Sequence, residues 1–174
     1  MKPEQHYENC FVTVGTTRFD LLCEYITSGP VLETLKKMGC KNITFQIGNS
    51  DRKPGQFEME GININMYRFK NTIENDIRNA DFVISHAGAG SCLEVLDAKK
   101  PLLVVINEDL MDNHQLELAE QLQIDGHLFY CTCDTLKDTL EGIDFTMLVP
   151  FPDSNPQPFF KALDNMLQIK DKSH

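Results

Sequence analysis

Short apolar runs alternate with amphipathic segments along almost the whole chain, and this alternation restricts the fold more than any other feature. The runs FVTV, FVIS and LLVVI, which begin at residues 11, 82 and 102, are apolar at nearly every position. Such runs are typical of strands that are buried on both faces of a sheet. The intervening segments, such as VLETLKKMG at 31–39, place apolar residues on one helical side. The pattern predicts an α/β, Rossmann-like fold: a mostly parallel sheet with helices on both faces.

The remaining segments fit a single domain. We expect residues 1–174 to form one globular unit, because no linker, repeat or low-complexity tract interrupts the chain. The stretch from 49 to 61, which contains NSDRKPGQ, is predicted to be a mobile loop. A proline-rich lead-in, PFPDSNPQP at 150–158, runs into the start of a last amphipathic helix at 156–170. The apolar side of this helix either packs on the domain's own sheet or docks a partner.

The charge balance and the cysteines exclude several classes of function. Lys and Arg number 16 against 26 Asp and Glu, which gives a net charge of -10. A chain this acidic is a poor partner for nucleic acid or for an anionic membrane surface. Its apolar runs are far shorter than a membrane span requires. The six cysteines have no zinc-like spacing and follow no secretion leader, so we expect a cytoplasmic protein with reduced thiols. Cys131 and Cys133 are expected to pack at a strand end.

Three junctions between a strand and the next helix are candidate ligand sites, because ligands of such sheets bind at the C-terminal ends of the strands. They are Gly15-Thr16-Thr17, His86 to Ser91, and Asn107 to Gln115. The second junction is the richest. Gly88 and Gly90 allow a tight turn and a close approach of the backbone to a ligand. A helix that begins near Ser91 would direct unpaired amides and the positive end of its dipole at the same place, which suits a phosphate.

Two other interpretations of the second junction stay open from its pattern. Ser91-x-x-Glu94 is also a capping box, in which each side chain satisfies the other residue's backbone amide, and the glycines would then be a structural turn. Gly88-x-Gly90 is also half of a dinucleotide fingerprint, with Glu108 near the position that binds a ribose. The third glycine is missing here, and that fingerprint usually follows the first strand of its fold. His86 by itself fits a structural residue as well as a ligand contact.

Longer stretches of the chain resemble one family. FVTVGTTRFD, ISHAGAGSCLE and KPLLVVINEDLMDNHQLELAEQL are similar to the soluble catalytic subunits of the two-part N-acetylglucosaminyltransferase in the dolichol pathway, and the resemblance runs from Phe11 to about Asp134. It implies addition of the second N-acetylglucosamine to dolichol-diphosphate-N-acetylglucosamine, which forms the chitobiosyl lipid used in protein N-glycosylation. A looser likeness extends to the donor-binding half of two-domain (GT-B) glycosyltransferases, whose His-x-Gly-x-x-Ser-x-x-Glu pattern occurs here at 86–94.

The resemblance implies a role for each motif residue. His86 would contact the outer phosphate of UDP-N-acetylglucosamine and stabilise the charge on the departing UDP. Glu94 would accept hydrogen bonds from the ribose hydroxyls. The other substrate-binding residues implied are, around the diphosphate, Gly15, Thr16, Thr17, Gly88, Ala89, Gly90 and Ser91 and, at the donor sugar, Asn113, His114 and Gln115. No metal and no other cofactor is implied, because the helix end supplies the positive field.

The resemblance also implies a second subunit. One sheet domain supplies the donor site, whereas nothing in the chain recognises a polyprenyl acceptor. An inverting transferase of this kind would receive its dolichol-linked acceptor and its general base from a membrane-anchored partner, which recruits this subunit to the cytosolic face of the endoplasmic reticulum. The helix at 156–170 would help to dock that partner. The alternative is a nucleotide-sugar-binding regulatory module without catalysis.

Overall fold

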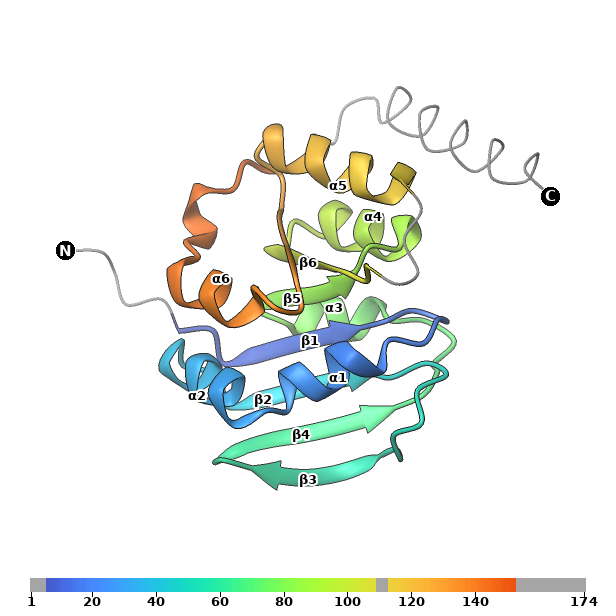
Figure 1. The fold of residues 1–174 in the computed structure, drawn as a ribbon, viewed down its shortest axis with the longest axis vertical. Coiled ribbons are helices and arrows are strands. Elements are labelled where there is room, and N and C mark those ends of the chain that lie inside the picture. The colour runs from blue at the N-terminus through green and yellow to red at the C-terminus, as the bar shows by residue number, and fades with distance from the viewer. Residues whose placement is uncertain (1–5, 109–112, 153–174) are drawn as a thin grey trace.

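The computed structural model describes residues 6–108 and 113–152, which contain seven strands in one sheet (Figure 1). The strands are β1 (Asn9–Thr13), β2 (Asn42–Gln46), β3 (Gly55–Met59), β4 (Ile62–Tyr67), β5 (Phe82–His86), β6 (Leu102–Ile106) and β7 (Phe129–Thr132). Their order across the sheet is β3-β4-β2-β1-β5-β6-β7. Each neighbouring pair is parallel except β3 and β4, which are antiparallel. The predicted mostly parallel sheet is confirmed.

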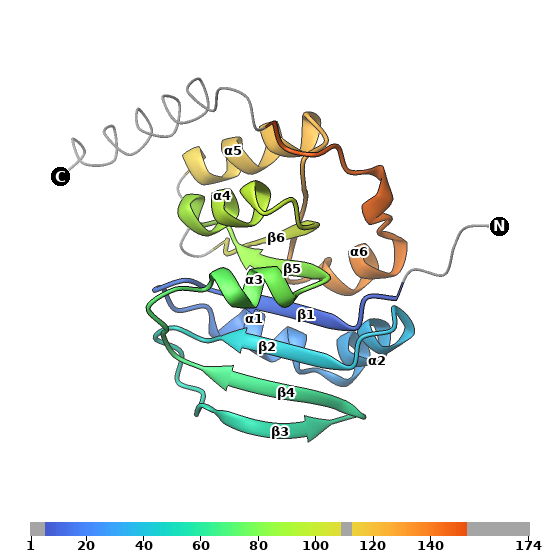
Figure 2. The same ribbon diagram turned by 180° about the vertical axis from the view of Figure 1, so that it is seen from behind.

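Helices cover both faces of the sheet, as Figures 1 and 2 show from opposite sides. One face carries α1 (Asp20–Ile26), α2 (Gly29–Lys37), α6 (Leu136–Gly142) and the short 3-10 helix Phe145–Met147. The other face carries α3 (Glu74–Asn79), α4 (Ala89–Asp97) and α5 (Asn113–Ile124). Successive residues of β1 enter different cores, since Val12 packs in the core with α1 and α2 and Phe11 packs in the core with α3 and α4. This two-sided burial explains the continuous apolar runs and confirms the Rossmann-like α/β prediction.

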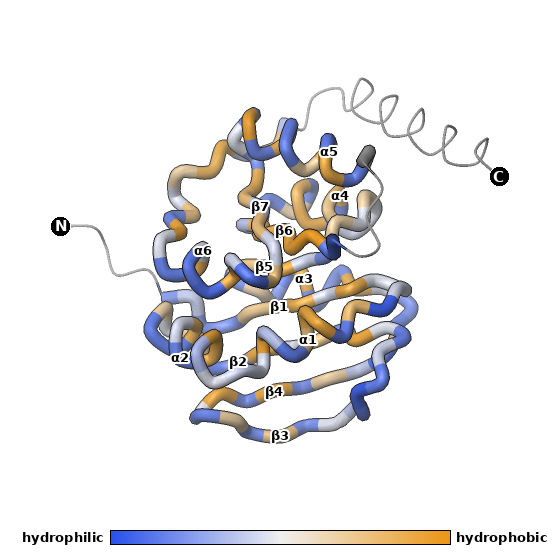
Figure 3. Tube along the Cα trace, in the orientation of Figure 1, coloured by the Kyte–Doolittle hydropathy of each residue, from blue (hydrophilic) through white to orange (hydrophobic). Residues whose placement is uncertain are grey.

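The stretch from 49 to 61 differs from the prediction, because its second half is a strand. Residues Gly55–Met59 form the edge strand β3, which pairs with β4. Glu60 and Gly61 join the two strands with φ values of 52° and 82°, as a two-residue hairpin turn of type I′ requires. The loop prediction was wrong for these residues because it rested on their polar composition. An edge strand that is exposed at almost every residue needs no apolar run, and Figure 3 shows that β3 has mixed hydropathy whereas β6, far from it in the sheet, is hydrophobic.

Three further predictions concern the cysteines, the membrane and the tail. All six cysteines are free and buried, and burial raises the pKa of Cys92, Cys131 and Cys133 to about 12. The thiols of Cys131 and Cys133 are therefore packed and protonated, as expected. Across the described ranges, no helix has both the length and the apolar character needed to cross a bilayer. The predicted helix at 156–170 lies outside the described residues.

Candidate functional site

The direction in which successive strands are added to the sheet reverses between β1 and β5. From β1 the chain continues to β2 and β4 on one side, and it later returns to β5 on the other side of β1. The loop after β1 leads to α1 on one face, whereas the loop after β5 leads to α4 on the opposite face. Open α/β sheets bind their ligands between two such loops. The first two predicted junctions, at Gly15 and at His86, therefore lie at the point where the fold favours a ligand.

The imidazole of His86, the last residue of β5, lies between two glycines. A Cβ atom built on Gly15 would be 2.8 Å from the His86 Nε2 atom, and one built on Gly88 would be 2.3 Å from Cε1. Both separations are too short for real side-chain contacts, so this position of the ring requires glycine on both sides. Gly15 also has a φ of +63°, which glycine adopts readily. The turns after β1 and β5 thus enclose the ring, and a side chain in place of either glycine would displace it.

Burial lowers the pKa of His86 to about 4. At neutral pH the imidazole is therefore uncharged and offers one N–H donor and one acceptor nitrogen. The main chain at this residue is held in place, because the Ser85 hydroxyl and the Cys92 thiol donate to the His86 carbonyl oxygen at 2.9 and 3.7 Å. Any positive potential at this point therefore comes from backbone dipoles rather than from an imidazolium ion.

Helix α4 begins at Ala89, three residues before the start that a capping box at Ser91 requires. Gly88 is its N-cap residue, and no side chain caps the helix. The Cys92 amide donates to the Gly88 carbonyl oxygen at 3.0 Å, so the amides of residues 89–91 precede the first intrahelical hydrogen bond. The capping-box interpretation is wrong, because Ser91 is already the third helical residue. Its Oγ atom lies 3.7 Å from where a Cβ on Gly15 would be, so the hydroxyl faces the loop after β1.

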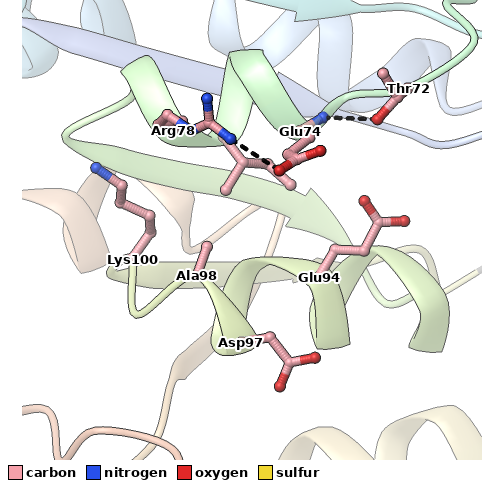
Figure 4. Close-up of a pocket in the computed structure, with 8 residues that line it drawn as sticks. Thr72, Glu74, Arg78, Glu94, Asp97, Ala98 and Lys100 are labelled. Carbon is pink, nitrogen blue, oxygen red and sulfur yellow. Dashed lines mark hydrogen bonds and ion pairs between the residues drawn. The ribbon is translucent and has the colours of Figure 1, made fainter.

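Glu94 is exposed in the second turn of α4 and lines a groove between α3 and α4 (Figure 4). The groove has a volume of about 670 Å³, within the range of about 300–1,000 Å³ that small-molecule sites occupy. Its lining residues are Thr72, Glu74, Ile77, Arg78, Glu94, Asp97, Ala98 and Lys100. Glu94 stands at the end nearest the tip of β5, and Lys100 stands at the other end (Figure 4). A carboxylate here can accept hydrogen bonds from a ligand that extends from the start of α4.

The loop after β1 is a tight turn. The Thr17 amide and hydroxyl both donate to the Val14 carbonyl oxygen, at 3.2 and 2.8 Å, and the Gly15 amide donates to the Thr13 hydroxyl at 3.0 Å. Thr16 and Thr17 are exposed. The structure therefore brings Gly15 together with His86, Gly88 and Ser91, and it leaves the two threonines on the accessible rim of that cluster.

The third junction is described only in part. Helix α5 begins at Asn113, the side chains of Asn113 and His114 lie outside the described residues, and Gln115 is half-buried in the first turn. Their contacts with a donor sugar stay a prediction.

Among residues 6–108 and 113–152, no three His, Cys, Asp or Glu side chains gather as metal ligands would. The half-match to the dinucleotide fingerprint follows β5, the fifth strand along the chain, rather than the first.

The sequence patterns did not single out the turn that follows β2. Gly48 has a φ of +57°, and a Cβ built on it would lie 2.4 Å from the Thr17 carbonyl oxygen. Asn49 donates from its backbone amide to the same oxygen at 3.1 Å. A glycine two residues after the end of a strand, as at Gly15, was the available signal. The turn after β2 thus packs directly against the turn after β1.

Comparison with known proteins assigns this arrangement to a family. Residues 9–166 match the glycosyltransferase family 28 C-terminal domain. The chain belongs to this family. The chain is 52% identical over 126 residues to the UDP-N-acetylglucosamine transferase subunit ALG13 of Homo sapiens, and this match covers 72% of this chain and 11% of that protein. It is 28% identical over an alignment of 197 residues to the subunit of the same name from Cryptococcus neoformans. This alignment covers 93% of this chain and 98% of that one. The chain thus spans about a tenth of the length of its human relative.

Solved structures agree with the observed fold. An NMR solution structure of ALG13 has a TM-score of 0.69 and 26% sequence identity, and the match covers 91% of this chain and 95% of that one. The crystal structure of Acinetobacter baumannii MurG has a TM-score of 0.59 and 22% identity, over 80% of this chain and 42% of that one. The glycosyltransferase SnogD from Streptomyces nogalater matches with a TM-score of 0.54 and 15% identity, over 81% of this chain and 36% of that one. These likenesses show the Rossmann-like fold of GT-B glycosyltransferases.

Proposed function

We propose that this family 28 domain is the donor-binding catalytic subunit of an inverting N-acetylglucosaminyltransferase. It would move N-acetylglucosamine from UDP-N-acetylglucosamine onto dolichol-diphosphate-N-acetylglucosamine and so form the chitobiosyl lipid. The observation that carries the proposal is the convergence of Gly15, His86, Gly88 and Ser91 where the strand order diverges. The relatives named as UDP-N-acetylglucosamine transferase subunits support the choice of donor.

The diphosphate of the donor would bind at the start of α4. The amides of residues 89–91 precede the first intrahelical hydrogen bond, and the positive end of the helix dipole adds to their field. A Cβ atom on Gly90 would meet nothing within 4 Å, so the backbone there is open to a ligand. These local dipoles are needed because the chain as a whole carries a charge of -10 and repels anions. The Ser91 hydroxyl would donate a further hydrogen bond, with Thr16 and Thr17 closing the opposite side.

Glu94 would bind the ribose. Its carboxylate lies one helical turn beyond Ser91, at the end of the groove nearest the tip of β5 (Figure 4). Two carboxylate oxygens can accept from two adjacent hydroxyls, which is the donor pattern that a ribose presents. Because no side chain caps α4, a capping role does not compete with this function of Glu94. At the sugar end, we assign contacts with the donor hydroxyls to Asn113, His114 and Gln115.

The transfer step would use the same dipoles. The acceptor hydroxyl oxygen forms a bond to the anomeric carbon while the bond from that carbon to the outer phosphate breaks. The electron pair of the broken bond goes to the phosphate oxygen, where negative charge develops. The amides of residues 89–91 and the neutral N–H of His86 are held in place before the reaction, so they stabilise that charge with little reorganisation. The acceptor proton passes to a base that we place in the partner subunit.

The partner would supply the other half of the site. The match to MurG covers 42% of that chain, so more than half of that protein lies outside the matched region. We propose that a membrane-anchored subunit takes its place here, presents the dolichol-linked acceptor and holds this chain at the cytosolic face of the endoplasmic reticulum. The segment at 156–170, outside the described residues, would contribute to docking.

Reconstitution tests the proposed function. The chain is purified, mixed with UDP-N-acetylglucosamine and dolichol-diphosphate-N-acetylglucosamine, and assayed with and without membranes that contain the partner. We expect transfer only in the presence of the partner. Turnover by the chain alone would contradict the split site. Binding of the donor without turnover in any complex would identify the alternative, a nucleotide-sugar-binding regulatory module.

Truncation tests the docking role of the tail. A chain without residues 159–174 should remain folded by circular dichroism and lose co-sedimentation with membranes that carry the partner. If the truncated chain still co-sediments, the docking surface lies elsewhere on the domain.

A further inference from the structure

The turn after β2 supports the turn after β1 through the main chain. The Asn49 backbone amide donates to the Thr17 carbonyl oxygen at 3.1 Å, and the Asn49 side-chain amide donates to the Thr16 carbonyl oxygen at 3.0 Å. Gly48 lies close enough that a Cβ atom would be 2.4 Å from the Thr17 oxygen and 2.9 Å from the Gly15 oxygen. The carbonyl oxygens of the first turn are therefore directed into the second turn.

Arg68, which directly follows β4, holds the second turn in place. Its guanidinium donates to the carbonyl oxygens of Gly48 at 3.3 Å, Ser50 at 2.7 Å and Arg52 at 3.0 Å. The Gly48 amide in turn donates to the Arg68 carbonyl oxygen at 3.2 Å. A planar guanidinium can satisfy several acceptors at fixed angles, which a lysine ammonium cannot reproduce.

Asp20, at the start of α1, holds the same turn from the other side. One of its carboxylate oxygens accepts hydrogen bonds from the Ser50 hydroxyl and, at 3.2 Å, from the Asp51 amide. The turn after β2 is therefore fixed by a cation and an anion from two different elements. Because both sides of the turn are anchored, its backbone is less mobile than that of an ordinary surface loop of the same length.

We propose that Arg68 and Asn49 are positioning residues for the donor diphosphate, an inference that rests on the proposed function. Carbonyl oxygens carry partial negative charge and repel phosphate. Asn49 keeps the Thr16 and Thr17 oxygens hydrogen-bonded, and Arg68 holds the turn that contains Asn49, so the two residues keep those oxygens from facing the diphosphate. Neither side chain needs to touch the nucleotide. They act through the turn that contains Gly15 and its contact with His86.

The test compares UDP with uridine, because uridine has the nucleoside but not the phosphates. The wild-type chain of residues 1–174 and its variants Asn49→Ala and Arg68→Lys are titrated with each ligand and followed by NMR chemical shifts. The matched control is Asn63→Ala. Asn63 is exposed like Asn49 and also donates a side-chain hydrogen bond, to Asn42 at 3.3 Å, but it lies at the opposite end of β4.

We expect UDP affinity to fall roughly three- to tenfold in Asn49→Ala and roughly tenfold or more in Arg68→Lys. Uridine affinity should not change, and Asn63→Ala should match the wild type for both ligands. An unchanged affinity for UDP, or an equal loss for UDP and uridine, would overturn the inference. If Arg68→Lys does not fold, Asn49→Ala decides alone, because that side chain is exposed. A wild-type chain that binds UDP no better than uridine would instead contradict the proposed function.

Discussion

The buried imidazole of His86 makes folding depend on pH in a way that can be worked out from the structure. Burial lowers its pKa from 6.5 to about 4 in the folded chain. The unfolded chain therefore binds a proton at a higher pH, so the stability is fully present above about pH 6.5 and is lost as the pH falls towards 4. At about 1.36 kcal/mol per pKa unit, the whole effect is about 3 kcal/mol. About 2 kcal/mol of it is lost between about pH 7.5 and pH 5.

Urea unfolding of the wild type and of His86→Gln at these two pH values measures this loss. Carboxylates titrate in both proteins, so their contribution cancels in the comparison. The free energy of unfolding of the wild type should fall by about 2 kcal/mol more than that of the variant. An equal fall in both proteins would show that the ring is not desolvated, and the assignment of His86 as a neutral donor would be wrong.

The same residue links donor binding to protons. A diphosphate close to the ring favours the imidazolium form, so its pKa should rise when UDP binds. Near pH 5, where the buried ring is mostly neutral, UDP binding should take up protons in the wild type and not in His86→Gln. Calorimetry in two buffers of different ionisation enthalpy measures that uptake. Equal proton uptake by the two proteins would place the phosphates away from His86.

Three other substitutions test separate parts of the description. Glu94→Gln should leave the melting temperature nearly unchanged, because no side chain caps α4, and should weaken UDP-N-acetylglucosamine binding by about ten- to a hundredfold; calorimetry and a thermal melt on one sample decide this. Gly88→Ala should displace the His86 ring, because its Cβ would lie 2.3 Å from Cε1, and should lower UDP affinity in the same titration; an unchanged affinity would refute the glycine requirement. Glu60→Asn should raise the free energy of unfolding by about 0.5–1 kcal/mol, since asparagine tolerates positive φ, and urea unfolding would contradict this if the midpoint did not rise.

The class of fold and the location of the main loop could be predicted from the sequence alone. The runs at residues 11, 82 and 102 are apolar at successive positions, which only strands covered on both faces require, and β1, β5 and β6 occupy those places. The glycine-rich junction after β5 was also predictable, because Gly88 and Gly90 follow a buried strand and precede an amphipathic helix. These features are local, so a short window of sequence contains all the information. The edge strand β3 was not predicted, because its residues are almost all exposed and therefore show no run of apolar residues.

The construction of the candidate site could not be predicted in the same way, because it depends on contacts between distant segments. The sequence pattern placed the start of α4 near Ser91 and left a capping box open as one interpretation, whereas the helix begins at Ala89 and no side chain caps it. The turns after β1, β2 and β5 meet because parallel crossovers bring distant strand ends to one edge of the sheet. The fit of His86 between Gly15 and Gly88, and the hydrogen bonds from Arg68 to the turn after β2, join residues far apart in the chain. No periodicity encodes such contacts, because they depend on packing distances that exist only once the whole sheet has formed.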